Sequence, residues 1–264
     1  MRVYVEGVGL VGPGLHGWEG SRAVLAGTEA YVYAPTVIAA SELLPAAERR
    51  RTGAPVKLAL AAGSEAFSNA ARDAATTATV FTSSGGDGEN VHQMCETLAS
   101  EEREVSPTRF HNSVHNAAAG YWSIATGSRE PSTSLCGYDS SFAAGLLEAA
   151  AQVATDRAPV ALIAYDHRYP HPLSVVRPIN ADFAMALVLT AEPSAQTLAI
   201  LDVSHVVDDT PATPMSDAAL ETVRAGVPAG RSLPLLVTLA RRQTQVVILE
   251  YTGASRVRVV VRPC

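Results

Sequence analysis

Lysine is almost absent from this chain of 264 residues, and Lys57 is the only one. Charged residues make up only 17% of the sequence, and the formal net charge is -6 with an isoelectric point of about 5.6. A protein that binds nucleic acid normally presents a basic face, whereas the one basic run here is Arg49, Arg50 and Arg51. We therefore predict no nucleic-acid partner. The three arginines are interpreted as a solvated turn, with a short contact to an acidic carrier protein as the alternative.

Cysteine is also sparse, and long apolar runs are missing. Cys95, Cys136 and Cys264 form an odd set without CxxC spacing, which argues against a disulfide framework and against a zinc site. Residues 1–14 lack a basic segment followed by a long apolar run, so we predict no signal peptide. No stretch is apolar for long enough to span a bilayer. We therefore expect a cytoplasmic protein that binds neither a membrane nor a metal ion.

Glycine-rich loops are present, but they lack the residues that phosphate binding needs. The run from Ser83 to Gly88 has no Lys followed by Ser or Thr, and the opening GVGLVG does not reproduce the dinucleotide-binding spacing. Tight turns at the ends of strands are the plainer interpretation. We predict no cofactor.

The abundant residues are apolar, at 47% of the sequence, which suffices for a sizeable core in one large domain or two small ones. Residue patterns predict strands at 3–11, 78–82, 132–135, 160–165, 183–190 and 198–206, with a terminal hairpin of 246–251 and 256–261. They predict helices at 18–26, 45–51, 57–71, 91–101, 117–124, 140–155 and 218–225. The apolar run 233–240 fits either a strand or a helix. We expect 183–190 and 198–206 to be adjacent and antiparallel. This order predicts an α/β fold in which helices pack in layers on a mixed sheet.

Several segments resemble, in order and spacing, the N-terminal half of ketoacyl synthases, which have the thiolase fold. They are the opening EGVGLVGP from Glu6 to Pro13, the NAAAG of Asn116 to Gly120 with Ser123, Ile124, Gly127, Arg129, Pro131 and Ser134, the alanine-rich helix from Ser140, and DFAMALVL from Asp182 to Leu189. The resemblance covers roughly residues 1–202. It implies a single truncated thiolase-like domain, 1–264, with an N-terminal-like half at 1–203. Residues 204–264 would be a remnant of the second half that contains the terminal hairpin.

The resemblance fails at the nucleophile. In the family, a sharp strand-to-helix turn presents an active cysteine, whose thiolate is favoured by the helix N-terminus. The alignment places Asp139 at this position, whereas Cys136 falls three residues earlier. A carboxylate carries acyl groups poorly, because the mixed anhydride hydrolyses easily, so we expect Asp139 to cap the following helix. A slip of one residue would place Ser140 there, and serine would need a base beside it.

The family's two histidine motifs, of HGT and NxxxHxxGAxG type, are also missing. Those histidines polarise the malonyl thioester and help to expel carbon dioxide. Only about sixty residues follow Val203, too few for a complete second half. We therefore expect no catalytic residue for condensation in this chain.

Other polar and aromatic residues have two interpretations each. His111, Asn112, His115 and Asn116 either line an acyl or carrier-protein pocket or cap the helix near 117 and satisfy loop backbone. Tyr138 and Phe142 flank the turn and either plug the acyl entrance or pack in the core. Asp166, His167 and His171 are interpreted as surface-loop residues, with an interface role as second choice.

In its shortened form the chain resembles synthase-like subunits of aryl-polyene and related polyene pathways. This resemblance implies a non-condensing, chain-length-factor-like subunit that pairs with a full-length ketoacyl synthase and reaches the acyl carrier protein through that partner. Pairing would run edge to edge through 132–137, with Ser134 and Leu135 at the interface, and would bound the partner's acyl tunnel. Two alternatives stay open. One is an acyltransferase or thioester hydrolase that uses Ser140, Asp139 or Cys136, and the other is a homodimeric acyl-binding protein.

Overall fold

The computed structural model describes residues 1–39 and 42–264. Within these ranges, nine strands form one mixed sheet in the order β4-β3-β5-β6-β1-β7-β9-β8, with β2 paired to β1. The strands are β1 (Arg2–Gly12), β2 (Leu15–His16), β3 (Ala78–Thr82), β4 (Ser132–Leu135), β5 (Val160–Asp166), β6 (Phe183–Thr190), β7 (Ala199–Val207), β8 (Gln245–Glu250) and β9 (Ser255–Pro263). The terminal hairpin of β8 and β9 is confirmed.

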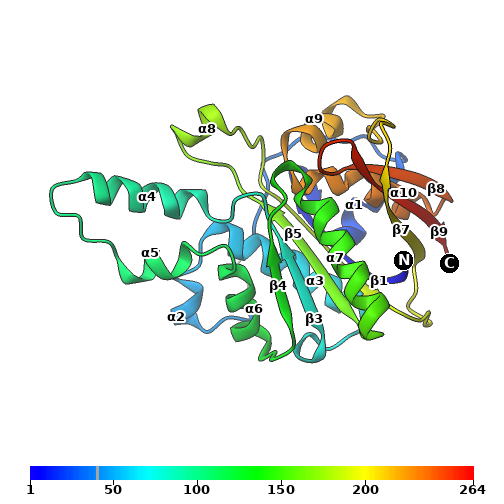
Figure 1. Cartoon of the computed structure of the whole chain (residues 1–264), viewed down its shortest axis with the longest axis horizontal. Helices are drawn as coiled ribbons and strands as arrows, with labels where there is room; N and C mark the ends of the chain where they lie inside the picture. Colours follow the sequence, from blue (N-terminus) through cyan, green and yellow to red (C-terminus); the bar gives the residue numbers. More distant parts are fainter. Residues whose placement is uncertain (40–41) are drawn as a thin grey trace.

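Helices cover both faces of this sheet (Figure 1). The α-helices are α1 (Trp18–Ala26), α2 (Ala46–Arg49), α3 (Ala54–Ala70), α4 (Gly88–Ala99), α5 (Pro107–Asn112), α6 (Ala117–Thr126), α7 (Ser141–Asp156), α8 (Leu173–Val176), α9 (Ala218–Gly226) and α10 (Leu233–Arg241). Three short 3-10 turns are η1 (Ala74–Thr76), η2 (Tyr138–Ser140) and η3 (Ala229–Ser232). The undecided run 233–240 is therefore helical.

The core lies in two layers, one on each side of the sheet. In Figure 1, α7 crosses in front of the sheet and α3 lies behind it. Apolar side chains of α7, α9 and α10 pack with β1, β6, β7 and β9 into one cluster, and those of α3 and α6 pack against the opposite face of β5 and β6 in a second. Both faces of β5 and β6 are thus buried, which explains why these strands read VALIAYD and FAMALVLT without alternation.

The prediction that β6 and β7 are adjacent and antiparallel is wrong. Strand β1 lies between β6 and β7 and is antiparallel to both, so β6 and β7 run parallel to each other. The connection 191–198 is long enough to pass one strand, since neighbouring strands are only about 4.8 Å apart. Strand β7 pairs with β1 only from Arg2↔Asp202 to Val5↔Ala199, and along its whole length with β9.

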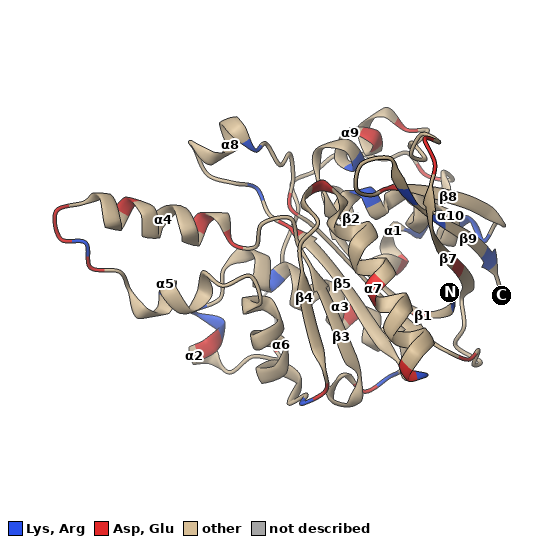
Figure 2. Cartoon of the chain, in the orientation of Figure 1, with Lys and Arg blue, Asp and Glu red and all other residues tan. Residues whose placement is uncertain are grey.

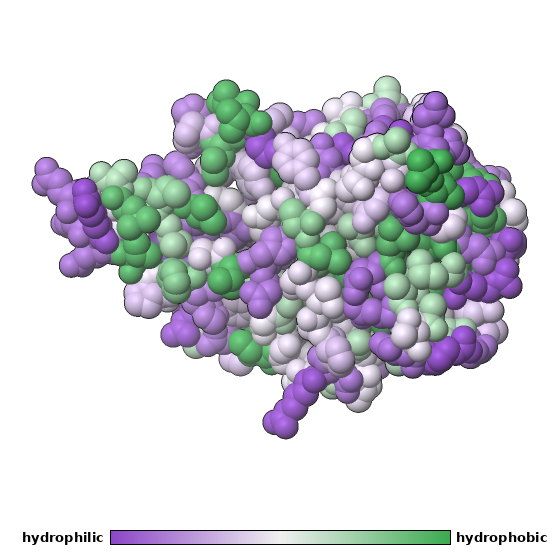
Figure 3. Space-filling view, viewed as in Figure 1, coloured by the Kyte–Doolittle hydropathy of each residue, from purple (hydrophilic) through white to green (hydrophobic). Residues whose placement is uncertain are grey.

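An arm formed by α4, α5 and the segment between them projects away from the sheet (Figure 1). Its tip is acidic, with Glu101, Glu102 and Glu104 around the single Arg103 (Figure 2). Apolar side chains gather over the arm and over α8 in Figure 3, and Leu98 of α4 and the Phe110 side chain of α5 are exposed. No described helix is both long and apolar enough to cross a bilayer.

Candidate functional site

The expected strand-to-helix turn exists. Strand β4 runs through Cys136 and Gly137 into η2 and then into α7, a course that we call the elbow. The Ser141 hydroxyl fixes it, because this group accepts a hydrogen bond from the Gly137 N–H (3.0 Å) and donates one to the Tyr138 carbonyl (2.7 Å). Tyr138 adopts a φ of 54°, a left-handed conformation that is uncommon for an aromatic residue. The elbow is thus a strained and closely tied turn.

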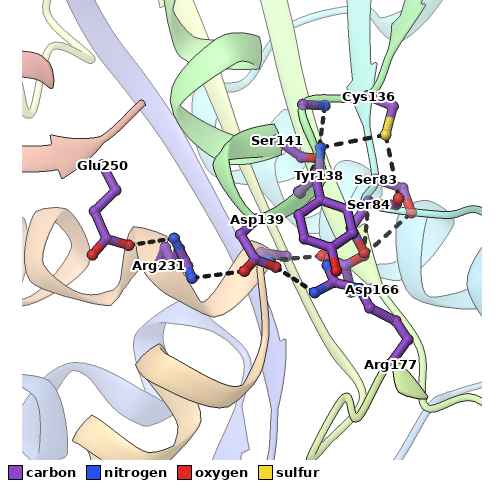
Figure 4. A network of polar contacts seen from close by, with 12 residues as sticks. Ser83, Ser84, Cys136, Tyr138, Asp139, Ser141, Asp166, Arg177, Arg231 and Glu250 are labelled. Atoms are coloured by element: carbon purple, nitrogen blue, oxygen red, sulfur yellow. Dashed lines mark hydrogen bonds and ion pairs between the residues drawn. The ribbon is translucent and has the colours of Figure 1, made fainter. Parts of the chain in front are cut away.

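Asp139 projects from the elbow toward two arginines rather than toward the helix (Figure 4). Its Oδ1 lies 2.6 Å from Arg177 Nη1 and its Oδ2 lies 3.2 Å from Arg231 Nη2. Arg231 also pairs with Glu250 of β8. Helix α7 starts after Ser140, and no described side chain makes a capping hydrogen bond there. The expectation that Asp139 caps α7 is therefore wrong, because charge-assisted bonds to the two guanidinium groups take both carboxylate oxygens.

The other two candidate nucleophiles bond to backbone carbonyls. The Ser140 hydroxyl donates to the Tyr251 carbonyl at 3.2 Å, and the Cys136 thiol donates to the Ser84 carbonyl at 3.2 Å. Neither hydrogen bond offers a base that would remove the proton. Cys136 lies just after β4 and is exposed.

The two aromatic residues at the elbow lie in different environments. Phe142 is buried among core residues of α7 and the sheet, so core packing is the interpretation that the structure shows. Tyr138 is 60% exposed, and the Arg177 guanidinium lies 3.7 Å from the centre of its ring. A cation over an aromatic face is an attractive contact, which ties the ring to the same arginine that holds Asp139.

A buried carboxylate lies beneath the elbow. Asp166 ends β5 and accepts hydrogen bonds from the Ser84 N–H (2.9 Å), the Ser84 hydroxyl (2.6 Å) and the Ala229 N–H (2.7 Å). Burial raises the pKa of Asp166 to about 6, against the hydrogen bonds from Ser84 and Ala229, which act to lower it. The surface-loop interpretation is wrong for Asp166. The signal that sequence reasoning missed is a carboxylate placed directly after a fully apolar strand.

His167 is also largely buried, and its Nδ1 lies 2.8 Å from Asp182 Oδ1. Although burial acts to raise it, hydrogen bonds from His167 and Arg168 hold the pKa of Asp182 far below its usual value. Only His171 of this trio is exposed as expected.

The four residues of the FHNSVHN run divide between loop contacts and the surface. The Asn112 amide donates to the Arg51 carbonyl (2.7 Å), and His115 Nε2 lies 3.0 Å from the Ser83 carbonyl. These contacts confirm that Asn112 and His115 satisfy loop backbone. Asn116 precedes α6 but makes no capping bond to any described residue, so the capping role is wrong for it. His111 is exposed and packs edge-on against Tyr121.

A hollow of about 560 Å³ lies beside the free edge of β4. His115, Asn116 and Ser134 line it together with small residues of α6. Leu135 turns inward and packs against the larger core cluster. The structure therefore brings three of the predicted interface residues together at this edge, whereas Tyr138 and Asp139 lie at the elbow.

Comparison with known proteins identifies the family to which the chain belongs. The chain matches the family described as beta-ketoacyl synthase, N-terminal domain, over residues 18–249. A chain of the solved complex of a ketosynthase (ApeO) with its chain length factor (ApeC) from Xenorhabdus doucetiae is 21% identical, with a TM-score of 0.74, over 98% of this chain and 99% of that one. The comparison with curated proteins finds no match.

Two further solved structures have the same fold. A chain of the ishigamide ketosynthase/chain length factor is 18% identical, with a TM-score of 0.76, over 100% of this chain and 99% of that one. A beta-ketoacyl synthase from Burkholderia phymatum STM815 is 16% identical, with a TM-score of 0.62, over 86% and 70% of the two chains. The predicted thiolase-like fold is thereby confirmed. Because the family match spans most of its length, this chain belongs to the beta-ketoacyl synthase N-terminal domain family.

Proposed function

We propose that the chain is a non-condensing, chain-length-factor-like subunit that pairs with a catalytic ketoacyl synthase. The observation that carries the proposal is Asp139, which stands at the elbow where the family presents a thiol and has both oxygens held by arginines. A carboxylate engaged in two ion pairs is a poor nucleophile, and the anhydride it would form is short-lived in water. The missing histidine motifs leave decarboxylation of a malonyl group without its electrophilic partners.

The proposed partner contact is the open edge of β4. Thr79 N–H donates to the Pro131 carbonyl and Ser83 N–H donates to the Leu135 carbonyl. Backbone groups alternate in direction along a strand, so those of Ser132 and Ser134 point away from β3. A strand edge of this kind is a template for pairing with another sheet.

The similar solved structures support this assignment, because two of them are complexes of a ketosynthase with a chain length factor. In the proposed pair, the synthase performs the chemistry and receives the acyl carrier protein, and this chain bounds the acyl tunnel near β4. Of the predicted lining residues, His115, Asn116 and Ser134 line the hollow beside β4, and these three are the ones that we propose for the tunnel wall. We propose elongation of a polyene or fatty-acid-type chain as the reaction that the pair serves.

Co-expression with a full-length synthase tests the proposal, and a proline substitution in β4 tests whether this strand edge forms the contact. Ser134→Pro removes one outward N–H and leaves the bonds to β3 intact, so we expect the chain to fold but to lose the partner in co-purification. Ser134→Ala keeps the N–H and should retain the partner. Equal co-purification of both variants would contradict pairing through this edge.

The chain alone should release no carbon dioxide from malonyl-carrier protein and form no acyl adduct, as mass spectrometry of the intact protein would show. Condensation by the chain alone would refute the proposal. A stable adduct on Ser140 or Cys136 would instead favour the acyltransferase or hydrolase. Failure to pair, together with a dimer of the chain in gel filtration, would favour the homodimeric acyl-binding protein.

A further inference from the structure

We propose that Asp139 is a tethered ligand that fills a carboxylate-binding site made by Arg177 and Arg231. The elbow is in this view occupied by the chain's own carboxylate, and removal of that group opens a site for a small free carboxylate such as acetate or malonate. The proposal concerns the elbow alone, and it holds or fails independently of pairing with a synthase.

The geometry is that of a two-point clamp. One arginine binds each oxygen of the Asp139 carboxylate, Arg177 at 2.6 Å and Arg231 at 3.2 Å. The side chains of Arg177 and Arg231 are only 18% and 19% exposed, whereas that of Asp139 is 36% exposed. Largely buried guanidinium groups that face a solvent-accessible carboxylate place the anion where a ligand from solution would enter.

Each arginine has a second contact that does not involve Asp139. The Arg177 guanidinium lies 3.7 Å from the centre of the Tyr138 ring, and Arg231 is paired with Glu250 (Figure 4). Loss of the Asp139 carboxylate therefore leaves both cations oriented toward the vacated place. Such preorganisation lowers the ordering cost of binding a new anion.

The site also has unused donors and space. Arg177 Nη2 and Arg231 Nε are buried without a hydrogen-bond partner among the described residues, although buried donors are normally satisfied. A hollow of about 280 Å³ adjoins Tyr138, Asp139 and Arg177, several times the volume of about 30 Å³ that one water occupies in the liquid. The hollow lies on the Arg177 side of the site and Arg231 does not line it, so the part of a malonate that extends beyond the clamped carboxylate would enter from that side.

In the natural protein, an incoming carboxylate competes with one that is covalently held at the site. Tethering gives the internal group an effective concentration in the millimolar range or above, so free carboxylates are excluded. A free malonyl carboxylate therefore finds no vacant anion site at this elbow.

The test is chemical rescue of Asp139→Ala in the full chain. Sodium acetate or malonate is titrated while the melting temperature is followed, with sodium chloride at equal ionic strength as reference. We expect a saturable rise of about 3 °C at roughly ten times the dissociation constant in the variant. The natural protein should show no saturable rise. Neither should Glu19→Ala, which removes a carboxylate from the exposed pair with Arg22.

Arg177→Met added to Asp139→Ala should abolish the rescue, because only one guanidinium then remains. A folded Asp139→Ala protein without a saturable response would overturn the proposal, as would equal binding by the natural protein in isothermal titration. If the alanine variant does not fold, Asp139→Ser, which retains a short polar side chain, undergoes the same titration and is judged by the same two outcomes. Synthase pairing of the rescued variant is measured separately, so the two proposals fail independently.

Discussion

At the residue scale, one buried carboxylate joins segments that are far apart in the sequence. Asp166 of β5 accepts bonds from Ser84, after β3, and from the Ala229 N–H of η3. It also interacts with the hydroxyls of Ser83 and Ser84 and with the charged or titratable groups of Arg177, Tyr165 and Tyr169. Because the carboxylate is fully enclosed, its ionisation is costly in the folded chain, and that cost depends on pH.

The pKa of Asp166, about 6 in the folded chain, lies above the ordinary aspartate value. The folded chain therefore binds this proton more tightly than the unfolded chain does. The tighter binding of this proton stabilises the folded chain fully below about pH 4, and this contribution is lost as the pH rises through 6. We expect Asp166→Asn to lose this part of the pH dependence, up to about 3 kcal/mol between pH 4 and pH 8. Urea unfolding at several pH values measures it.

Glu65 and Asp87 also have pKa values raised by burial, but both are present in the natural protein and in the variant. The difference between the two proteins therefore isolates Asp166. Parallel curves of unfolding free energy against pH would show that Asp166 does not titrate in this window.

The sequence placed an aspartate at the elbow but did not reveal what holds it. Arg177 and Arg231 come from segments well beyond β5, and spacing along a chain does not show which distant loops meet. The same limit hid Asp166, whose following residues HRYPHP are polar and proline-rich like an exposed loop. Its burial is due to Ser84 and Ala229, which only the folded chain brings to it.

At the element scale, the contact between β1 and α3 depends on the absence of side chains. A Cβ built on Gly9 would lie 1.9 Å from the Ala62 carbonyl oxygen, and one on Gly7 would lie 2.1 Å from that of Ala66. Both obstacles are backbone atoms, which cannot rotate away. The strand and the helix therefore approach each other as closely as glycine allows.

We expect Gly9→Ala to separate β1 from α3 and to lower the free energy of unfolding by about 3 kcal/mol or more. Gly20→Ala in α1 is the matched control, because, apart from its chain neighbours and the nearby backbone of its own helix, no described atom lies within 4 Å of its added Cβ. The control should be neutral or gain up to about 1 kcal/mol through helix propensity. Thermal and urea unfolding compare the two, and similar stability of both variants would refute the close-contact argument.

Local patterns identified most elements, because strand and helix periodicity belong to short stretches of sequence. The strands at 78–82, 132–135 and 183–190 lie where the patterns placed them. The choice of neighbours is not local: β1 took the place beside β6 that was expected for β7. The run 233–240 was undecided because it is short and apolar, a length at which buried strands and helices read alike.

At the scale of the whole molecule, the arm gives the chain an uneven surface. Phe110 on the arm is 66% exposed, and Leu98 lies on the helix beside it. The sequence predicted a helix at 91–101 but not its projection, since a helix pattern does not show what the helix packs against. The division into 1–203 and 204–264 stays a prediction.

Phe110→Ser tests whether the arm contacts the proposed synthase partner. We expect an unchanged melting temperature, because the ring is exposed, and a loss of about tenfold in affinity for the synthase. Val207→Ser is the control, since Val207 is 80% exposed but ends β7, away from the arm. A binding titration with the purified synthase compares them. Equal affinities would exclude the arm from the interface.

The narrow junction between β1 and β7 has a consequence for cooperativity. Hydrogen bonds join the two parts of the sheet over only the short stretch from Arg2 to Val5, yet one apolar cluster runs continuously beneath both parts. The terminal strands β8 and β9 cannot melt by themselves without exposing to water the apolar face of α10, which packs against them. Because α10 and α7 belong to the same apolar cluster, we expect a defect in the last sixty residues or so to weaken the packing of α7 at the elbow as well.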